Sequence, residues 1–222
     1  MAINIAIDGP SAAGKSTIAE MLAEKYHMVH LDTGAMYRLV AYKATKSGID
    51  YDDEDALEDM IFHTSIKMEP DGSMYLDGEP ITSEQIRTDE MSMASSAVSR
   101  HKKVRAALVA MQQEISKDKG YILDGRDIGT VVLKDAEVKI FLVASAEARA
   151  RRRIKQNLEK GLEVKDFETV LKEIQERDLQ DSTRENSPLV KADDAIEVDN
   201  SDGTLEELLD KISVYVDKAL LQ

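Results

Sequence analysis

A glycine-rich segment near the start of the chain carries the residue types that bind a nucleoside triphosphate. Residues 9–16 read Gly-Pro-Ser-Ala-Ala-Gly-Lys-Ser and match the pattern G-x-x-x-x-G-K-[ST] in full. Glycines let the backbone turn so that successive N–H groups point at phosphate oxygens, and the positive end of the following helix adds to this attraction. In this pattern Lys15 reaches the β- and γ-phosphates, and the hydroxyl of Ser16 binds Mg²⁺ directly. The predicted triphosphate-binding residues are Gly9, Pro10, Ser11, Ala12, Ala13, Gly14, Lys15, Ser16 and Thr17.

Two further clusters are typical of a site for a second anionic substrate. Arg38 lies one helical turn after Gly34, where its planar guanidinium suits a phosphate monoester. Asp124-Gly125-Arg126-Asp127 ends a predicted strand, and open α/β sheets bind ligands beyond such strand ends. There, Asp124 can orient Mg²⁺ and its waters, while Arg126 and Asp127 can project into the cleft. An ordinary surface arginine and a salt-bridged turn are the alternative interpretations of the two clusters.

A third cluster lies on one predicted helix late in the chain. Arg177, Asp181 and Arg184 are spaced by four and three residues, which places them on one face of that helix. We expect this face to take part in the same second site. An exposed ladder of ion pairs is the alternative.

The elements that must position these residues alternate between strands and helices. A strand at Ile3–Ile7 precedes the glycine-rich loop, a helix follows from Lys15, and a strand at Met28–Leu31 leads to a helix over Ala35–Ser47. This alternation predicts an α/β fold with a parallel sheet. A Pro-Asp-Gly turn at residues 70–72 predicts an inserted antiparallel hairpin. Later strands are predicted at 121–124, 138–143 and 195–198, and helices at 83–99, 102–117, from Ser145, from Asp166 and from a Thr204–Glu207 capping box.

Composition excludes several classes of protein. The chain of 222 residues has 29 Lys and Arg against 43 Asp and Glu, a net charge of −14, and no cysteine. It therefore has neither disulfides nor thiolate metal sites. No apolar run is long enough to span a membrane, and no basic region precedes the first apolar run, so we expect no signal peptide. We expect a cytoplasmic monomer that binds neither membranes nor nucleic acid. The charged runs are a basic cluster (Arg149, Arg151, Arg152, Arg153, Lys155) and an acidic run at 50–59, which we interpret as a solvated loop and helix start.

Taken together, the four motifs at residues 9–17, 32–38, 124–127 and 177–184 resemble those of bacterial cytidylate kinases, which are P-loop nucleoside monophosphate kinases. The resemblance covers nearly the whole chain. It implies a P-loop core (1–32 and 118–222, with a short lid at about 150–165) and a CMP-binding subdomain (33–117, with a hairpin-rich insertion at about 64–82). The implied reaction is transfer of the γ-phosphoryl group of ATP to CMP or dCMP, with Mg²⁺.

The resemblance also implies roles for individual residues. Arg38 and Arg126 would grip the CMP phosphate, Arg177 and Asp181 would hold the ribose hydroxyls, and Arg184 would lie near the substrate. Ser96, Arg105 and Asp127 would read the cytosine edge, and Thr33 stands where the family often has serine. Arg153 is the lid arginine that we assign to ATP. The catalytic residues would be Lys15, Arg38, Asp124 and Arg126, and the CMP-binding residues Thr33, Tyr37, Arg38, Ser96, Arg105, Arg126, Asp127, Arg177, Asp181 and Arg184.

Three other functions stay open at this stage. A kinase of the same scaffold could act on UMP, AMP or shikimate. A nucleotide-dependent switch would hydrolyse ATP slowly without any acceptor, and a nucleic-acid binder would use the basic cluster. A GTPase is disfavoured, because no Asn-Lys-x-Asp segment follows a strand.

Overall fold

The computed structural model describes residues 2–69, 71–159 and 161–221, apart from the side chain of Asp89. These residues form two compact units, which we describe separately. The first unit comprises Met1–Met28 and Gly120–Gln222, and the second comprises Val29–Lys119.

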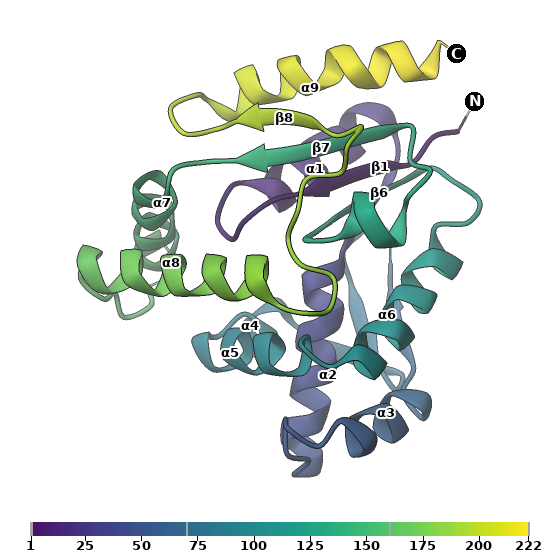
Figure 1. The fold of residues 1–222 in the computed structure, drawn as a ribbon, viewed down its shortest axis with the longest axis vertical. Helices are drawn as coiled ribbons and strands as arrows, with labels where there is room; N and C mark the ends of the chain where they lie inside the picture. Colours follow the sequence, from purple (N-terminus) through teal and green to yellow (C-terminus); the bar gives the residue numbers. More distant parts are fainter. Residues whose placement is uncertain (1, 70, 160, 222) are drawn as a thin grey trace. The chain divides into compact units, whose positions relative to one another are not determined.

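Parallel strands in the first unit surround the strand that precedes the glycine-rich loop. β1 (Ile5–Asp8) pairs with β6 (Tyr121–Gly125) on one side and β7 (Val138–Val143) on the other, and β7 pairs with β8 (Ile196–Asp199), as Figure 1 shows. The five-stranded sheet has the order β2-β6-β1-β7-β8, where β2 is Val29–Asp32. Because the order of connection reverses at β1, the residues after β1 stand where such folds bind ligands. The predicted α/β fold is confirmed.

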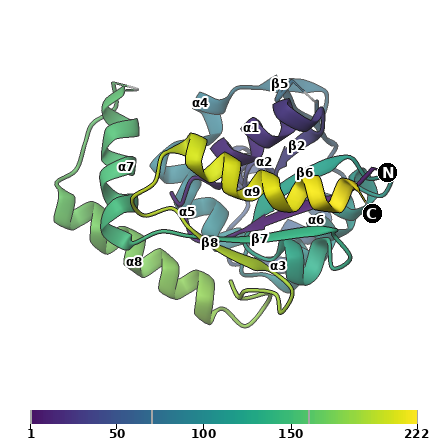
Figure 2. The same cartoon turned by 90° about the horizontal axis from the view of Figure 1, so that it is seen from above.

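Two helices cover this sheet. α1 (Lys15–Tyr26) and α9 (Leu205–Leu220) lie next to each other (Figure 2). Their apolar faces and the strands share one buried cluster, and each large side chain in it contributes roughly 1.5–3 kcal/mol through burial. The predicted capping box of α9 is present, since Thr204 accepts from the Glu207 N–H and Glu207 accepts from the Thr204 N–H. The buried isoleucines and leucines of the cluster are Ile3, Ile5, Ile7, Ile18, Leu22, Ile122, Ile140, Leu142, Leu208 and Ile212.

Beyond the end of β7, two helices pack against each other. α7 (Ala146–Glu159) and α8 (Phe167–Thr183) lie side by side (Figure 1), with Ala150, Val170 and Ile174 between them. The predicted cap at Ser145 is present, since its Oγ accepts from the Ala148 N–H. Asp166, from which a helix is predicted, accepts from the Thr169 N–H and caps α8.

The second unit combines helices with the inserted antiparallel sheet. β3, β4 and β5 are neighbours in that order, and both pairs are antiparallel. Their inner side chains pack on α2 through Ala35, Leu39, Met74 and Leu76. The elements are α2 (Thr33–Ser47), α3 (Glu54–Phe62), β3 (Ile66–Met68), β4 (Met74–Leu76), β5 (Glu79–Ile81), α4 (Ser83–Ile86), α5 (Asp89–Val98) and α6 (Lys102–Ile115).

The predicted hairpin is confirmed, although Pro70 in its turn lies outside the described residues. The predicted strands other than β7, and the helix predicted over 102–117, differ from the structure by one or two residues at their ends. Two further differences have a local cause. The helix predicted from Ala35 begins at Thr33, because the Asp32 side chain accepts from the Ala35 N–H at 2.9 Å and caps it. The single helix predicted over 83–99 is two helices, because Thr88 caps a new start.

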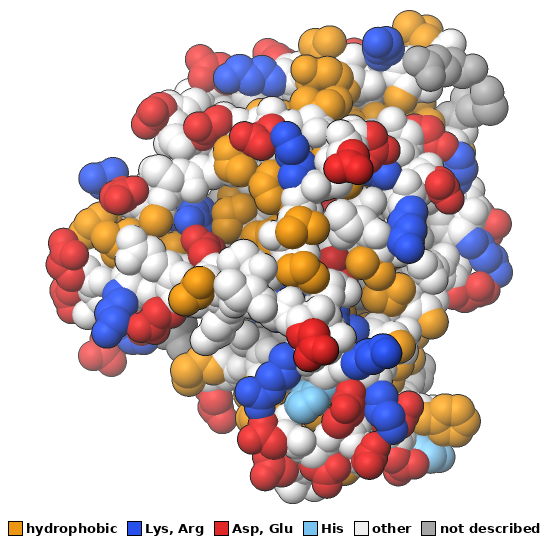
Figure 3. Space-filling view, viewed as in Figure 1, with side chains coloured by type: hydrophobic (Ala, Val, Ile, Leu, Met, Phe, Trp, Pro, Cys, Tyr) orange, Lys and Arg blue, Asp and Glu red, His pale blue; other side chains and the backbone are white. Residues whose placement is uncertain are grey.

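The acidic run at 50–59 contains an exposed helix start, as predicted, because α3 begins there. Lys103 from α6 also bridges Asp55 and Glu58 at 2.7 Å each. In Figure 3, red and blue side chains intermix over the region where Figure 1 places α3. These exposed pairs offset part of the local negative charge but add little stability. Within the described ranges, no helix is long and apolar enough to cross a bilayer.

Candidate active site

Residues 9–14 form a loop with backbone angles that few residue types tolerate. The φ angle is +149° at Gly9, +57° at Ala12 and +100° at Gly14. A Cβ on Gly9 would lie 2.0 Å from the carbonyl oxygen of Leu142 on β7, so this position requires glycine. The loop leads directly into α1, whose first residue is Lys15. A curled loop before a helix N-terminus presents N–H groups to an anion, which is the context that the motif requires.

The side chain of Lys15 is buried beside this loop. Its Nζ donates to the Pro10 carbonyl oxygen at 2.8 Å. Burial, and then the positive charge of Arg126, lower the pKa of Lys15 to about 7, while Asp124 opposes the shift. A buried ammonium of this kind gains more from a nearby anion than an exposed lysine does, because little water competes for it.

Two oxygen ligands for a hard cation meet at the start of α1. Ser16 Oγ donates to Asp124 Oδ2 at 2.9 Å, which joins α1 to the end of β6. A hydroxyl and a carboxylate suit Mg²⁺, which keeps several waters and also binds substrate phosphates. The residues present therefore fit this ion. No group of three or more His, Cys, Asp or Glu side chains gathers elsewhere in the described ranges, so a dedicated all-protein metal cage is absent there.

The strand-end and late-helix clusters meet within the first unit. Arg126 Nε donates to Asp181 Oδ2 at 2.7 Å, and Arg184 Nη1 lies 3.7 Å from Asp181 Oδ1. Burial raises the pKa of Asp181, but the charges of Arg126 and Arg177 outweigh burial and hold that pKa below its usual value. Both predicted clusters therefore belong to one network of charges, in which Arg126, Arg177 and Arg184 all act on the buried carboxylate of Asp181.

Asp8 contributes to the same region, although no motif marks it. Its carboxylate accepts from the N–H groups of Ile128 and Gly129 at 2.8 and 2.7 Å. Burial raises the pKa of Asp8 to about 6, and the two backbone hydrogen bonds offset only part of this effect. Asp8 thus fixes the turn that follows Arg126 and Asp127, which runs into the π-helix η1 (Ile128–Val132). An acidic residue ending an apolar strand was the only sequence signal.

In the second unit, two arginines share one carboxylate. Arg38 and Arg87 each place Nη2 at 2.9 Å from Asp32 Oδ2. A Cβ on Gly34 would lie 3.1 Å from the other oxygen of Asp32 and 3.3 Å from Arg38 Nη1, so glycine leaves room for this arrangement. Two guanidinium groups against one carboxylate leave a net positive charge, which suits a phosphate. Sequence reasoning missed Arg87, because no motif surrounds it.

Of the remaining predicted residues in the second unit, Arg105 and Tyr37 are in contact. The Arg105 guanidinium stands over the Tyr37 ring at 5.3 Å and donates to the Ser99 carbonyl oxygen at 3.0 Å. Thr33 is buried at the start of α2, and Ser96 lies half-buried on α5.

The basic cluster on α7 does not act as one patch. Arg149 is buried and pairs with Asp178 through both ends of its guanidinium, at 2.9 and 2.6 Å. Arg152 donates to the backbone oxygen of Asn200. Arg153, which we assign to ATP, is half-buried on the same helix. Arg149 and Arg152 are therefore held by hydrogen bonds within the protein. Arg151 stands over the Phe167 ring at 5.5 Å, and Lys155 Nζ lies 3.8 Å from Glu159 Oε1.

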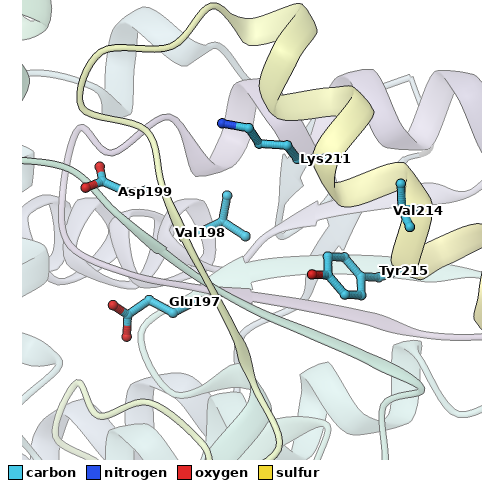
Figure 4. A pocket seen from close by; sticks show the side chains of 6 residues that line it. All are labelled: Glu197, Val198, Asp199, Lys211, Val214 and Tyr215. Atoms are coloured by element: carbon cyan, nitrogen blue, oxygen red, sulfur yellow. The ribbon is translucent and has the colours of Figure 1, made fainter.

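A groove of about 440 Å³ lies away from these residues, between β8 and α9. Figure 4 shows Glu197, Val198 and Asp199 projecting from β8, with Lys211, Val214 and Tyr215 on α9. It contains none of the predicted site residues.

Comparison with known proteins gives the family. A family model described as cytidylate kinase matches residues 5–218. A cytidylate kinase of Enterococcus faecalis is 51% identical over 210 residues, which is 93% of this chain and 92% of that protein. One of Bacillus velezensis is 49% identical over 219 residues, 97% of both chains. A solved shikimate kinase from Bacteroides thetaiotaomicron shares the fold, with a TM-score of 0.52 at 12% identity and coverage of 98% of this chain and 99% of that one. With a family match over nearly its whole length and relatives that are about half identical, the chain belongs to the cytidylate kinase family.

Proposed function

We propose that this protein transfers the γ-phosphoryl group of ATP to CMP, and also to dCMP, giving ADP with CDP or dCDP. The observation that carries the proposal is the glycine-rich loop with Lys15 and the Ser16–Asp124 pair, in a chain that belongs to the cytidylate kinase family. The loop supplies a site for the triphosphate, and the family supplies the acceptor.

On the donor side, residues 9–17 would bind the phosphates of ATP, and Arg153 would contact ATP from α7. Ser16 would hold Mg²⁺ directly, and Asp124 would hold it through water. When bound, Mg²⁺ neutralises charge on the transferring phosphates. Lys15 would donate to the β- and γ-phosphates in place of the Pro10 carbonyl, which it contacts now at 2.8 Å.

On the acceptor side, Arg38 and Arg126 would bind the CMP phosphate. Arg177 and Asp181 would hold the ribose hydroxyls, with Arg184 nearby. Thr33 and Tyr37 would line the nucleotide, and Ser96, Arg105 and Asp127 would read the cytosine edge. The Arg126–Asp181 hydrogen bond at 2.7 Å supports this assignment, because it orients the guanidinium before any ligand is present.

The proposed reaction needs no covalent intermediate with the protein. The phosphate of CMP is already an anionic nucleophile, so no general base is required. The residues would align the acceptor with the γ-phosphate and cancel charge on the transferring group. We propose that residues 33–117 form the CMP-binding subdomain and that residues 150–165 form the lid, which would exclude water from the transferring phosphate.

We further propose a cytoplasmic monomer without affinity for nucleic acid. The net charge of −14 supports the last point, because an acidic surface repels phosphate backbones. Light scattering coupled to size-exclusion chromatography gives the oligomeric state, and retention on DNA or RNA columns at low salt tests for nucleic-acid binding.

The deciding experiment identifies the products formed from ATP and Mg²⁺ with each candidate acceptor. CMP and dCMP should give diphosphates in equal amounts with ADP, ahead of UMP, AMP and shikimate. If the enzyme prefers another of these acceptors, that acceptor and not CMP is its substrate. ADP formed equally with and without any acceptor would favour a nucleotide-dependent switch instead.

A further inference from the structure

Two carbonyl groups of the glycine-rich loop are held from outside by side chains that no motif contains. Asn200 Nδ2 donates to the Ala13 oxygen at 2.9 Å, and Arg149 Nη1 donates to the Ser11 oxygen at 3.3 Å. A Cβ on Gly14 would lie 2.9 Å from Asn200 Nδ2, so glycine there also admits this amide. Both contacts engage carbonyl oxygens, and so they leave the N–H groups of the loop to a ligand.

These contacts flank the one strained alanine of the described loop. Ala12 has a φ of +57°, in the left-handed region that a residue with a Cβ adopts only at a cost in energy. Such a conformation persists where the surroundings fix it. The held carbonyls belong to the residues directly before and after Ala12, where they oppose relaxation of that backbone.

Both side chains are themselves fixed in place. The Arg149 guanidinium pairs with Asp178 on α8, and its Nε donates to the Ala144 oxygen at 2.9 Å. The Asn200 N–H donates to the Val143 oxygen at 2.8 Å. Arg152, one turn after Arg149 on α7, donates to the Asn200 oxygen and so connects α7 to the residue that holds the loop.

We propose that Asn200 and Arg149 are positioning residues that hold the loop in its anion-binding shape before the triphosphate arrives. Arg152 acts through Asn200. The inference rests on the proposed function in one respect, namely that the loop binds the triphosphate of ATP. Preorganisation of this kind lowers the free-energy cost of binding for the ligand at the loop and leaves the other substrate unaffected.

The test compares two buried asparagines. Asn200→Ala removes the contact to Ala13. Asn4→Ala removes a comparable buried contact, since Asn4 Oδ1 accepts from the Tyr121 N–H at 3.1 Å, but at the opposite end of β1. Binding of a non-hydrolysable ATP analogue with Mg²⁺ and of CMP is measured by calorimetry, alongside KM for both substrates and urea denaturation.

We expect Asn200→Ala to weaken analogue binding about tenfold, a ratio that corresponds to ~1.4 kcal/mol. KM for ATP should rise in parallel, because one net hydrogen bond at the loop is lost. KM for CMP should change less than about twofold. Asn4→Ala should lose similar stability without this change in binding. Arg152→Met should weaken analogue binding in the same direction, about threefold, and Arg152→Lys should restore part of it.

Unchanged analogue binding by Asn200→Ala, or equal losses for ATP and CMP, would overturn the positioning role. If Asn200→Ala does not fold, the Arg152 variants decide the question by the same split between the two substrates. If the wild type transfers phosphate but the variants show no such split, this inference alone is refuted. A wild-type protein that binds no ATP analogue refutes the proposed function with it.

Discussion

Replacing Lys15 with methionine should change stability and activity in opposite directions. Methionine matches the length of the lysine stem and fills the same buried space without a charge. The wild-type ammonium lies buried with the Pro10 carbonyl as its hydrogen-bond partner at 2.8 Å. In the proposed function its charge would bind the triphosphate, whereas burial of that charge lowers the stability of the fold.

The size of that cost follows from the pKa of Lys15. Burial and the charge of Arg126 lower this pKa from 10.5 to about 7. A shift of that size corresponds to about 5 kcal/mol of unfolding free energy at and below neutral pH. The lost hydrogen bond, with the Pro10 oxygen left without a donor, takes back ~1–3 kcal/mol. We therefore expect Lys15→Met to unfold with a free energy ~2–4 kcal/mol above that of the wild type at pH 7.

The pH dependence of the unfolding free energy tests whether the buried ammonium is destabilising. Between pH 7 and 10.5 the folded wild type binds fewer protons at Lys15 than the unfolded chain does, so its stability rises with pH. The wild type should therefore gain about 2–3 kcal/mol relative to Lys15→Met between pH 7 and pH 9. Activity should move the other way. Loss of a charged donor to the transferring phosphate costs ~3 kcal/mol or more, at least about 100-fold in kcat/KM.

Urea denaturation at pH 7 and pH 9, with a chelator present, measures the two stabilities, and a coupled assay for ADP measures the rate. Lys15→Leu is a control that keeps the apolar burial with a different shape and should show the same signs. A Lys15→Met protein less stable than the wild type would refute the account of the buried ammonium. Wild-type turnover by that variant would refute the assignment of the loop.

Three further substitutions test other contacts. Gly9→Ala should lower the unfolding free energy by at least about 3 kcal/mol in urea titrations, because its Cβ would lie 2.0 Å from the Leu142 oxygen; near-normal stability would contradict the loop geometry. Arg126→Met should lower kcat/KM for CMP about 10- to 100-fold while analogue binding stays within about threefold, and equal losses would remove Arg126 from the acceptor site. Asp8→Asn removes a carboxyl whose pKa rises from 3.8 to about 6, so charged Asp8 destabilises the fold above pH 6. Lowering the pH from about 6 to 4 should therefore stabilise the wild type relative to Asp8→Asn by ~2 kcal/mol, and a pH-independent difference in urea midpoints would count against it.

The sequence could predict features that depend on residues a few positions apart along the chain. The strand, loop and helix around Lys15 were predictable, since a β-branched run, two glycines and a helical pattern follow in order. The caps at Ser145 and Thr204 were predictable for the same reason, because a cap and its N–H partner lie three residues apart. The start of α2 at Thr33 was missed, since the choice between turn and helix depends on Asp32 acting as the cap.

Contacts between distant residues could not be predicted in this way. Arg149 and Ser11 lie 138 positions apart, and Asn200 and Ala13 lie 187 apart. Neither pair has a local spacing rule, so only the fold brings them together. The same applies to Arg87 and Asp32, which are 55 positions apart. Motifs identified the residues that would touch ligands, and the fold was needed to find the residues that hold those motifs in shape.

The basic cluster on α7 illustrates how a local charge count can mislead. Five positive residues in a protein of net charge −14 suggest a patch for a polyanion. Arg149, however, is buried in a two-point ion pair with Asp178, and Arg152 is committed to the backbone oxygen of Asn200. A protein binds nucleic acid more tightly with each solvent-accessible cation that neutralises a phosphate of the backbone. Arg149 and Arg152 could reach such a phosphate only by breaking their contacts within the protein. Their charge is better explained by its effect on the glycine-rich loop, which argues for a small polyphosphate ligand and against a polymer.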